Sequence, residues 1–199
     1  MADILVGDAA PSGRLPDTFV SNLEDYYSTS TFHESKDYVN YTDDIYVGYR
    51  YFLTIPGEDK KILYPFGFGL SYTSFSYRVS DLILDGDSVS LSVEVENTGL
   101  YKGKDVIEVY VESPEGLKLD RPKRVLAAFS KTPLLDSGEK STLTLSFSLR
   151  DIASFDDEGV VKERHWVLEK GEYQLLVSDN SLSFERKSLS ITDDRVFEY

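Results

Sequence analysis

The sequence predicts a mainly β protein: an antiparallel β-sandwich preceded by a largely irregular, extended arm. From residue 75 onward, short segments of alternating apolar and polar residues are separated by turn signals, which is the pattern of sandwich strands. Residues 1–74 instead show little periodicity and are crowded with Tyr, Asp, Ser and Asn. Hydrophobic residues make up 41% of the 199, enough to bury a sizeable core. We therefore expect an arm at residues 1–74 and a sandwich at residues 75–199.

Two segments give the clearest strand signal. In residues 88–96 and again in residues 141–149, every second residue is apolar, and the residues between them are Ser, Thr or Glu. Such a strand buries one face and exposes the other. A single helical or 3₁₀ turn is expected at residues 150–159, where Asp residues can cap a helix start. Five more strands are expected, at residues 105–112, 123–132, 166–169, 173–178 and 183–191.

The first of these five strands shows how we expect the side chains to be divided. Ile107, Val109 and Val111 lie in one row, because alternate residues of a strand point to the same side. This row should face the core. Glu108 and Tyr110 should then face outward.

The arm looks like a chain laid across another surface. Polar and turn-forming residues at 22–42 surround four tyrosines: Tyr26, Tyr27, Tyr38 and Tyr41. A tyrosine suits such a contact because it has an apolar ring and a polar tip. Arg50 lies among further tyrosines, where its guanidinium can stack on rings or pair with a carboxylate of a neighbouring domain. We favour this structural role of Arg50 over direct sugar contact.

Charge and composition exclude several classes of partner. Asp and Glu outnumber Lys and Arg by 35 to 21, and the net charge of -14 disfavours binding to nucleic acid or to anionic membranes. No apolar run approaches the roughly 20 residues of a membrane-spanning helix. Cysteine is absent, so no disulfide or thiolate site is expected. The absence of cysteine and of a secretory signal after Met1 favours the cytoplasm, but the localisation stays open.

Three stretches of the arm carry specific motifs. Residues 11–16 read Pro-Ser-Gly-Arg-Leu-Pro, followed by Thr18 and Phe19, residues 45–52 read Ile-Tyr-Val-Gly-Tyr-Arg-Tyr-Phe, and residues 65–73 read Pro-Phe-Gly-Phe-Gly-Leu-Ser-Tyr-Thr. The first resembles the end of the α/β sandwich domain of glycoside hydrolase family 3 enzymes. The second resembles the segment that follows that domain, and the third resembles the start of the last domain. Their order and spacing also match.

The resemblance continues into the predicted sandwich. Residues 102–111, 121–126 and 166–173 look like strands of the fibronectin type III-like domain that family 3 β-glucosidases and β-xylosidases commonly carry. The resemblance therefore covers nearly the whole chain. It implies a fibronectin type III-like, immunoglobulin-like sandwich, preceded by an arm from the end of the α/β sandwich domain.

The same resemblance implies that the catalytic residues lie elsewhere. A retaining glycosidase needs two carboxyl groups about 5 to 5.5 Å apart. In the family, the nucleophilic Asp belongs to the barrel domain and the acid/base residue lies upstream of the Pro-Ser-Gly motif, which begins here at Pro11. We assign no catalytic, cofactor-binding or metal-binding residue to this chain and expect no cofactor. Whether the chain is itself an enzyme stays open, although it is expected to be inactive alone.

Two acidic clusters are the rival candidates for catalysis. Asp43-Asp44 and Asp156-Asp157-Glu158 are runs of adjacent carboxylates, whose side chains point apart on an extended chain. We expect both to be solvated loops. Neither has the Asp-x-Asp-x-Asp-Gly spacing of a calcium loop, so calcium binding is a weaker alternative.

The two histidines and the single tryptophan complete the candidates. His33 and His165 are far apart and neither adjoins a serine nucleophile motif, so no catalytic triad can be read. His165 is expected to be packed or half-exposed on a strand, and His33 to help dock the arm. Trp166 could stack on a sugar, but a lone tryptophan on a strand is more often part of the core.

These observations favour an accessory, structural module. Its sandwich would pack against the catalytic domains of a parent enzyme that cleaves β-glucosides or β-xylosides, and its arm would fix their position. The alternative is a carbohydrate-binding or substrate-anchoring module, and an independent hydrolase is the least favoured reading. Expected partners are the parent's catalytic domains, with carbohydrate as the alternative, and a homodimer through the arm stays open.

Overall fold

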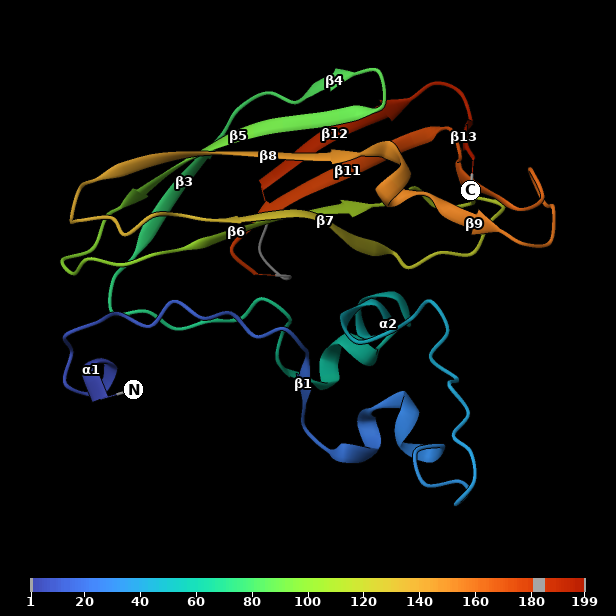
Figure 1. Cartoon of the computed structure of the whole chain (residues 1–199), viewed down its shortest axis with the longest axis horizontal. Helices are drawn as coiled ribbons and strands as arrows, with labels where there is room; N and C mark the ends of the chain where they lie inside the picture. Colours follow the sequence, from blue (N-terminus) through green and yellow to red (C-terminus); the bar gives the residue numbers. More distant parts are fainter. Residues whose placement is uncertain (1, 181–184, 199) are drawn as a thin grey trace.

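The computed structural model describes residues 2–180 and 185–198, in which two sheets form a sandwich and the arm runs along one of its faces (Figure 1). The first sheet has four strands: β3 (Phe75–Val79), β4 (Ile83–Asp85), β5 (Ser88–Asn97) and β8 (Lys140–Ser148). The second sheet also has four: β6 (Val106–Glu112), β7 (Arg124–Lys131), β11 (Gly171–Ser178) and β12 (Glu185–Ile191). All pairings in both sheets are antiparallel, so the predicted mainly β sandwich is confirmed.

The first sheet is built around β5. β8 pairs along the whole length of one edge, while β3 and β4 share the other edge, β3 beside the second half of β5 and β4 beside its start. The alternating pattern places the Val and Leu residues of β5 in the core and its Ser and Glu residues on the outer face. Alternation of this kind is therefore sufficient to position the central strand β5.

The second sheet has the strand order β12-β11-β6-β7. Ile107, Val109 and Val111 of β6 are buried in the sandwich core, as the alternation predicts. A register shift between Val109 and Tyr110 marks a bulge in the pairing with β7. The two sheets enclose one apolar cluster made almost wholly of Val, Leu and Ile.

A small third sheet closes one end of the sandwich. It has the order β13-β10-β9, from β9 (Ser154–Asp156), β10 (His165–Leu168) and β13 (Arg195–Phe197). Before it, the 3₁₀ helix η4 (Leu149–Ile152) begins at Ser148, whose side chain accepts a hydrogen bond from the Arg150 N–H. The predicted turn is therefore present, although β9 follows it where we expected no strand.

The seven predicted strands correspond to β5, β6, β7, β8, β10, β11 and β12. The first two residues of the last predicted strand, 183 and 184, lie outside the described residues. The sequence reading missed β3, β4, β9 and β13, which have five residues or fewer. Strands this short contain too few alternating positions to give a clear period of two.

The arm is irregular but ordered by several short elements. Its two helices are α1 (Ala2–Leu5) and α2 (Tyr49–Thr54), its 3₁₀ helices are η1 (Leu23–Asp25), η2 (Tyr27–Ser30) and η3 (Glu58–Lys61), and its two strands are β1 (Phe19–Val20) and β2 (Ile62–Tyr64). β1 and β2 pair with each other, far apart in sequence. Within the described residues, no helix is long and apolar enough to cross a membrane.

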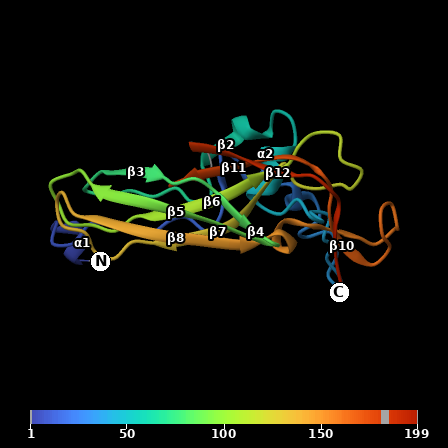
Figure 2. The same cartoon turned by 90° about the horizontal axis from the view of Figure 1, so that it is seen from above.

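The arm covers the outer face of β6, β7 and β11, and in Figure 2, which looks down on the sandwich, the arm lies behind the sheets. This corrects the expectation for Glu108 and Tyr110. Both side chains point out of the sandwich as predicted, but they are only 5% and 0% exposed. The physical reason is that the arm, rather than water, lies against this face of the sheet.

Candidate functional site

The site with the most specific chemistry is the contact between the arm and the outer face of the β12-β11-β6-β7 sheet, which we call the seam. Its apolar centre consists of Tyr49, Tyr110 and Leu176, all buried. The rings of Tyr49 and Tyr110 meet edge to face with centroids 5.9 Å apart, a favourable arrangement for aromatic pairs. Tyr49 also accepts a hydrogen bond from the Leu126 N–H at 2.8 Å through its hydroxyl oxygen. The arm is thus bound to the sheet by both packing and hydrogen bonding.

Helix α2 presents Tyr49 to the sheet. The helix has six residues, too few to be stable alone in water, so its packing against the sandwich must hold it. Gly48 precedes it with φ 60° and ψ -128°, a backbone conformation that favours glycine. At its other end, the Thr54 Oγ1 accepts a hydrogen bond from the Lys123 N–H at 2.9 Å. Both ends of α2 are therefore fixed.

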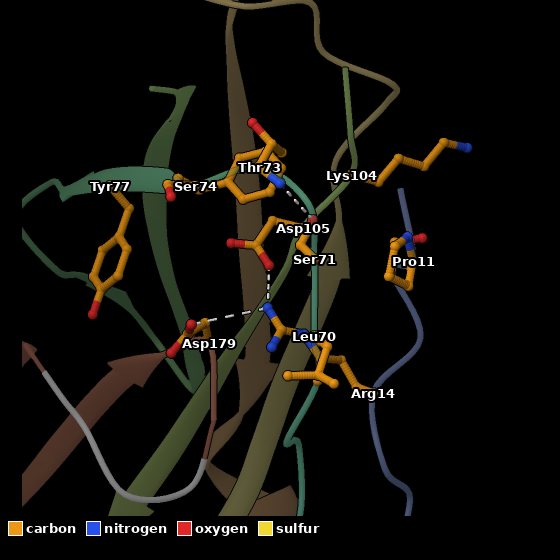
Figure 3. Close-up of a pocket in the computed structure, with 13 residues that line it drawn as sticks. Pro11, Arg14, Leu70, Ser71, Thr73, Ser74, Tyr77, Lys104, Asp105 and Asp179 are labelled. Carbon is orange, nitrogen blue, oxygen red and sulfur yellow. Dashed lines mark hydrogen bonds and ion pairs between the residues drawn. The ribbon is translucent and has the colours of Figure 1, made fainter. Parts of the chain in front are cut away.

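A polar clamp lies at the other end of the seam (Figure 3). Arg14 of the arm reaches the sandwich and forms an ion pair with Asp105, and its Nη2 lies 3.9 Å from Oδ2 of Asp179. Asp105 is 4% exposed, and its Oδ1 also accepts a hydrogen bond from the Val106 N–H. Burial raises the pKa of Asp105, and the neighbouring Arg14 guanidinium opposes that rise. Breaking this pair would leave a carboxylate buried without a counter-charge.

The clamp brings two of the sequence motifs together. The Leu15 N–H donates to the Phe68 carbonyl at 2.8 Å, and the Gly67 N–H donates to the Leu15 carbonyl at 2.9 Å. Gly67 has φ +79°, and a Cβ there would overlap the carboxylate of Glu108. The glycine therefore lets the arm backbone approach the sheet closely. The motifs at residues 11–16 and 65–73 are parts of one surface.

The side chain of Glu108 lies directly against the backbone of the arm at Gly67. It accepts a hydrogen bond from the Tyr110 hydroxyl at 2.6 Å, and both side chains are buried. Burial raises the pKa of Glu108, and the Tyr110 hydrogen bond opposes that rise. Burial also raises the pKa of Tyr110. The seam thus contains ionisable groups whose charged forms are disfavoured.

A cavity of about 200 Å³ opens beside the clamp (Figure 3). Its charged lining residues are two cations and two anions: Arg14, Lys104, Asp105 and Asp179. Arg14 lies between the two carboxylates and offsets their charge. This arrangement is suited to holding the arm in place.

Arg50, singled out in the sequence, lies on α2 but outside the seam. Its side chain is half-buried, and this side chain forms no hydrogen bond, ion pair or ring contact with any part of the chain that the structure describes. The predicted stacking on tyrosine is therefore not seen within the chain. Pairing with a carboxylate of a neighbouring domain stays a prediction.

The expectation for the second acidic cluster is wrong for its first residue. Asp156 is 1% exposed rather than solvated, and its carboxylate accepts hydrogen bonds from the N–H groups of four residues: Gly159, Val160, Val161 and Lys162. Burial alone would raise the pKa of Asp156, but these four bonds outweigh it and lower the pKa. The loop folds around the carboxylate, which explains why it is buried. Asp157 and Glu158 are exposed, as expected.

The remaining candidates are dispersed over the molecule. His33 contacts Phe32 in the arm at 4.6 Å between centroids, and His165 begins β10. Trp166 is half-buried in β10 and meets Phe155 edge to face at 5.5 Å, outside the main core cluster. Among the described residues, no group of three or more His, Cys, Asp or Glu side chains could hold a metal ion.

The seam itself was missed in the sequence, although a signal was present. Tyr110 and Leu176 belong to the outward rows of their strands, where a solvated sheet would carry polar residues. Apolar residues on both faces of neighbouring strands indicate a sheet that is covered on both sides. The second layer is the arm.

The other side of the arm is unusually apolar. Of the 24 large hydrophobic side chains that are exposed in the described residues, 15 belong to residues 1–74. Three of them, Phe19, Tyr64 and Leu70, border a groove of about 580 Å³. The wall of this groove is mainly apolar and also includes Leu15 and Phe68. A free apolar groove of this kind is typical of an interaction surface.

Comparisons with known proteins agree with the motifs. The profile of the glycosyl hydrolase family 3 C-terminal domain matches residues 1–72, and that of a fibronectin type III-like domain matches residues 105–181. β-Glucosidase A of Butyrivibrio fibrisolvens is 44% identical over 213 residues, covering 100% of this chain and 24% of that protein. β-Glucosidase of Ruminococcus albus is 43% identical over 86% of this chain and 18% of that protein.

Solved structures give the same result for the fold. A β-glucosidase from Paenibacillus barengoltzii has a TM-score of 0.93 and 44% identity over 99% of this chain and 22% of its own. β-Glucosidase 3B from Thermotoga neapolitana, solved with glucose, has a TM-score of 0.88 and 39% identity over 100% of this chain and 27% of its own. The chain thus spans about a quarter of the length of these relatives. It belongs to glycoside hydrolase family 3, as the C-terminal region with its fibronectin type III-like domain.

Proposed function

We propose that this chain is the non-catalytic C-terminal module of a larger family 3 enzyme, and that its arm docks on the rest of that enzyme. The observation that carries the proposal is the distribution of exposed apolar residues. Residues 1–74 hold 15 of the 24 exposed large hydrophobic side chains in the described part of the chain, although their inner side is already packed on the sandwich. Exposed apolar residues concentrated on the outer side of an ordered arm indicate a surface that binds a partner.

In this proposal the two parts have different roles. The sandwich, residues 75–199, is the stable base, and the arm, residues 1–74, is the adaptor that it holds in one conformation. Pre-ordering the arm by the seam removes conformational entropy before docking, which favours binding. Each large apolar side chain buried on docking would contribute about 1.5 to 3 kcal/mol.

The proposed activity of the longer protein is hydrolysis of β-glucosides. It is supported by the names of the relatives, which are β-glucosidases. The two catalytic carboxyl groups would belong to the part of the protein outside this chain. Within the chain, the seam carboxylates Asp105 and Glu108 are used in packing and ion pairing, which supports a structural role.

The test is a comparison of this chain with the longer protein on aryl β-glucoside and aryl β-xyloside. We expect turnover only by the longer protein and a preference for the glucoside. Turnover by the chain itself, lost on Asp44→Asn or Asp157→Asn, would refute the non-catalytic role. A preference for xyloside would leave the structural role intact and correct only the substrate.

The carbohydrate-binding alternative has less support. Trp166, the proposed platform for a sugar ring, packs against Phe155 and is only half-exposed. Its fluorescence gives a direct check, because a sugar stacked on the indole would change the emission. We expect no change with β-glucosides or cello-oligosaccharides.

A further inference from the structure

A second pocket in the arm has a different character from the apolar groove. It has a volume of about 440 Å³ and lies between η2, the loop before α2, and α2 itself. Carboxylates and tyrosine rings supply most of its wall, and we call it the acidic aromatic pocket after these residues: Asp17, Tyr27, Tyr41, Asp43, Asp44 and Tyr51. No Lys or Arg side chain lines it.

The carboxylates of this pocket lack counter-charges within the described part of the chain. Among the described residues, no Lys, Arg or His lies within ion-pair distance of Asp17, Asp43 or Asp44. Asp17 accepts one hydrogen bond, from the Thr18 N–H at 2.7 Å. Like charges gathered on one pocket disfavour one another, and a cation placed between them would relieve that repulsion.

The aromatic part of the wall favours the same kind of ligand. Tyr27 and Tyr51 are stacked with centroids 5.2 Å apart, and Tyr41 is 90% exposed at the pocket. The faces of such rings attract ammonium and guanidinium groups, with about 0.5 to 1 kcal/mol at exposed sites and more when water is excluded. Rings and carboxylates together therefore select a cation with a partly apolar body.

The backbone around the pocket fixes its walls. Asp44 has φ +49°, a value uncommon for a residue other than glycine. Gly48 has φ +60°, which favours glycine, and a Cβ there would be in ordinary van der Waals contact with Oδ1 of Asp17 at 3.6 Å. The pocket is thus largely formed before any partner binds, which lowers the entropy cost of binding.

We propose that the acidic aromatic pocket receives a lysine or arginine side chain from the part of the enzyme on which the arm docks. This inference rests on the proposed docking function and adds the chemistry of the partner. The charge of the pocket favours a basic side chain over a neutral sugar, which would leave three carboxylates without a counter-charge. It also gives the docking an orientation, because the charged residue that lines the apolar groove, Arg14, is already paired with Asp105.

The first test uses this chain and small probes. N-acetyl-arginine amide is titrated against the chain and followed by NMR of the tyrosine rings, with N-acetyl-citrulline amide as the neutral isostere and methyl β-glucoside as the sugar. We expect saturable binding of the arginine probe at millimolar concentration, weakened at least 5-fold by 0.5 M salt and absent for citrulline. Equal binding of citrulline, or saturable binding of the glucoside alone, would overturn the proposal.

Matched variants locate the effect. Asp43→Asn with Asp44→Asn removes two charges from the pocket, and Asn tolerates the positive φ at position 44. Asp85→Asn with Glu115→Gln removes two exposed charges from the sandwich. We expect at least 5-fold weaker binding of the arginine probe only for the pocket variant. An equal loss of probe binding in both variants would show a general effect of net charge and would contradict binding at the acidic aromatic pocket.

The second test uses the longer protein. The pocket variant should lower its thermal unfolding temperature relative to the control variant, and this difference should shrink at high salt. Probe binding without any difference in the longer protein would overturn the docking role of the pocket. The proposed function fails separately, if the chain itself hydrolyses aryl glucosides.

Discussion

The two sheets of the sandwich differ most in their outer faces. The face formed by β5 and β8 carries Ser, Thr and Glu, and no other layer of the described residues covers it. The face formed by β6, β7 and β11 carries Tyr110, Leu126 and Leu176, and the arm covers it. The sandwich therefore shows in its own sequence which side has a partner. The same logic applied to the arm, whose outer side is apolar, leads to the proposed docking surface.

The largest expected effect is that of removing the aromatic centre of the covered face. Tyr110→Ala deletes a fully buried ring and should lower the free energy of unfolding by about 3 to 5 kcal/mol. Urea unfolding gives the value, and proteolysis of the arm should become faster. Tyr41→Ala, on the outer side at 90% exposure, should change stability by less than about 0.5 kcal/mol. Equal losses of stability in the two variants would contradict the difference between the face of the sheet that the arm covers and the exposed outer side of the arm.

The next effect is that of breaking the polar clamp. Arg14→Ala leaves Asp105 buried without its counter-charge, which should cost about 3 kcal/mol in urea unfolding. Adding Asp105→Asn to this variant should recover part of the loss, because a neutral amide is less costly to bury. A double variant less stable than Arg14→Ala would show that Asp105 acts mainly through its other contacts.

Two glycines with nearly the same positive φ allow the close contact between the arm and the sheet to be tested separately from backbone strain. Gly67 and Gly116 have φ 79° and 78°, but only at Gly67 would a Cβ meet another group, the Glu108 carboxylate. Gly116→Ala should cost about 1 kcal/mol for the positive φ. Gly67→Ala should cost about 1 to 3 kcal/mol more from the overlap. Similar melting temperatures for the two variants would mean that the arm adjusts freely at this point.

The smallest expected effect is a dependence on pH. Because burial raises the pKa of Glu108, the folded state binds this proton more tightly than the unfolded chain does. The protonated form stabilises the fold, and this contribution is lost as pH rises through the raised pKa. Glu108→Gln should therefore be at least as stable as the wild type at pH 7, with a smaller gain on acidification. Parallel pH profiles of the two proteins in urea unfolding would contradict this.

The sequence predicted the structure best in strands that bury one face and expose the other to solvent. β5 alternates from Ser88 to Glu96 and β8 from Thr142 to Ser148, so their register relative to the core follows from the pattern. Helix α2 could not be found this way, because six residues give no helical period and its stability comes from Tyr49 packing on the sheet. The motifs identified the family, and the structure adds which surfaces they form.

The candidate sites depend on contacts that no local pattern contains. Arg14 and Asp105 are 91 residues apart, so their pairing appears only when the arm lies on the sandwich. Asp17 lines the same pocket as Asp43 and Asp44 because the arm folds back on itself. Asp156 was misjudged because its burial results from a loop that folds back to supply four N–H donors. A run of carboxylates in a sequence does not reveal such a loop.

The most direct test of the central claim is amide hydrogen exchange in this chain and in the longer protein. The seam amides of Lys123 and Leu126, which donate to Thr54 and Tyr49, should be protected in both. The amides of residues 35–44, in an exposed irregular part of the arm, should exchange quickly in this chain and slowly in the longer protein. Equal exchange of the outer side in both proteins would contradict the claim that the arm is a docking surface.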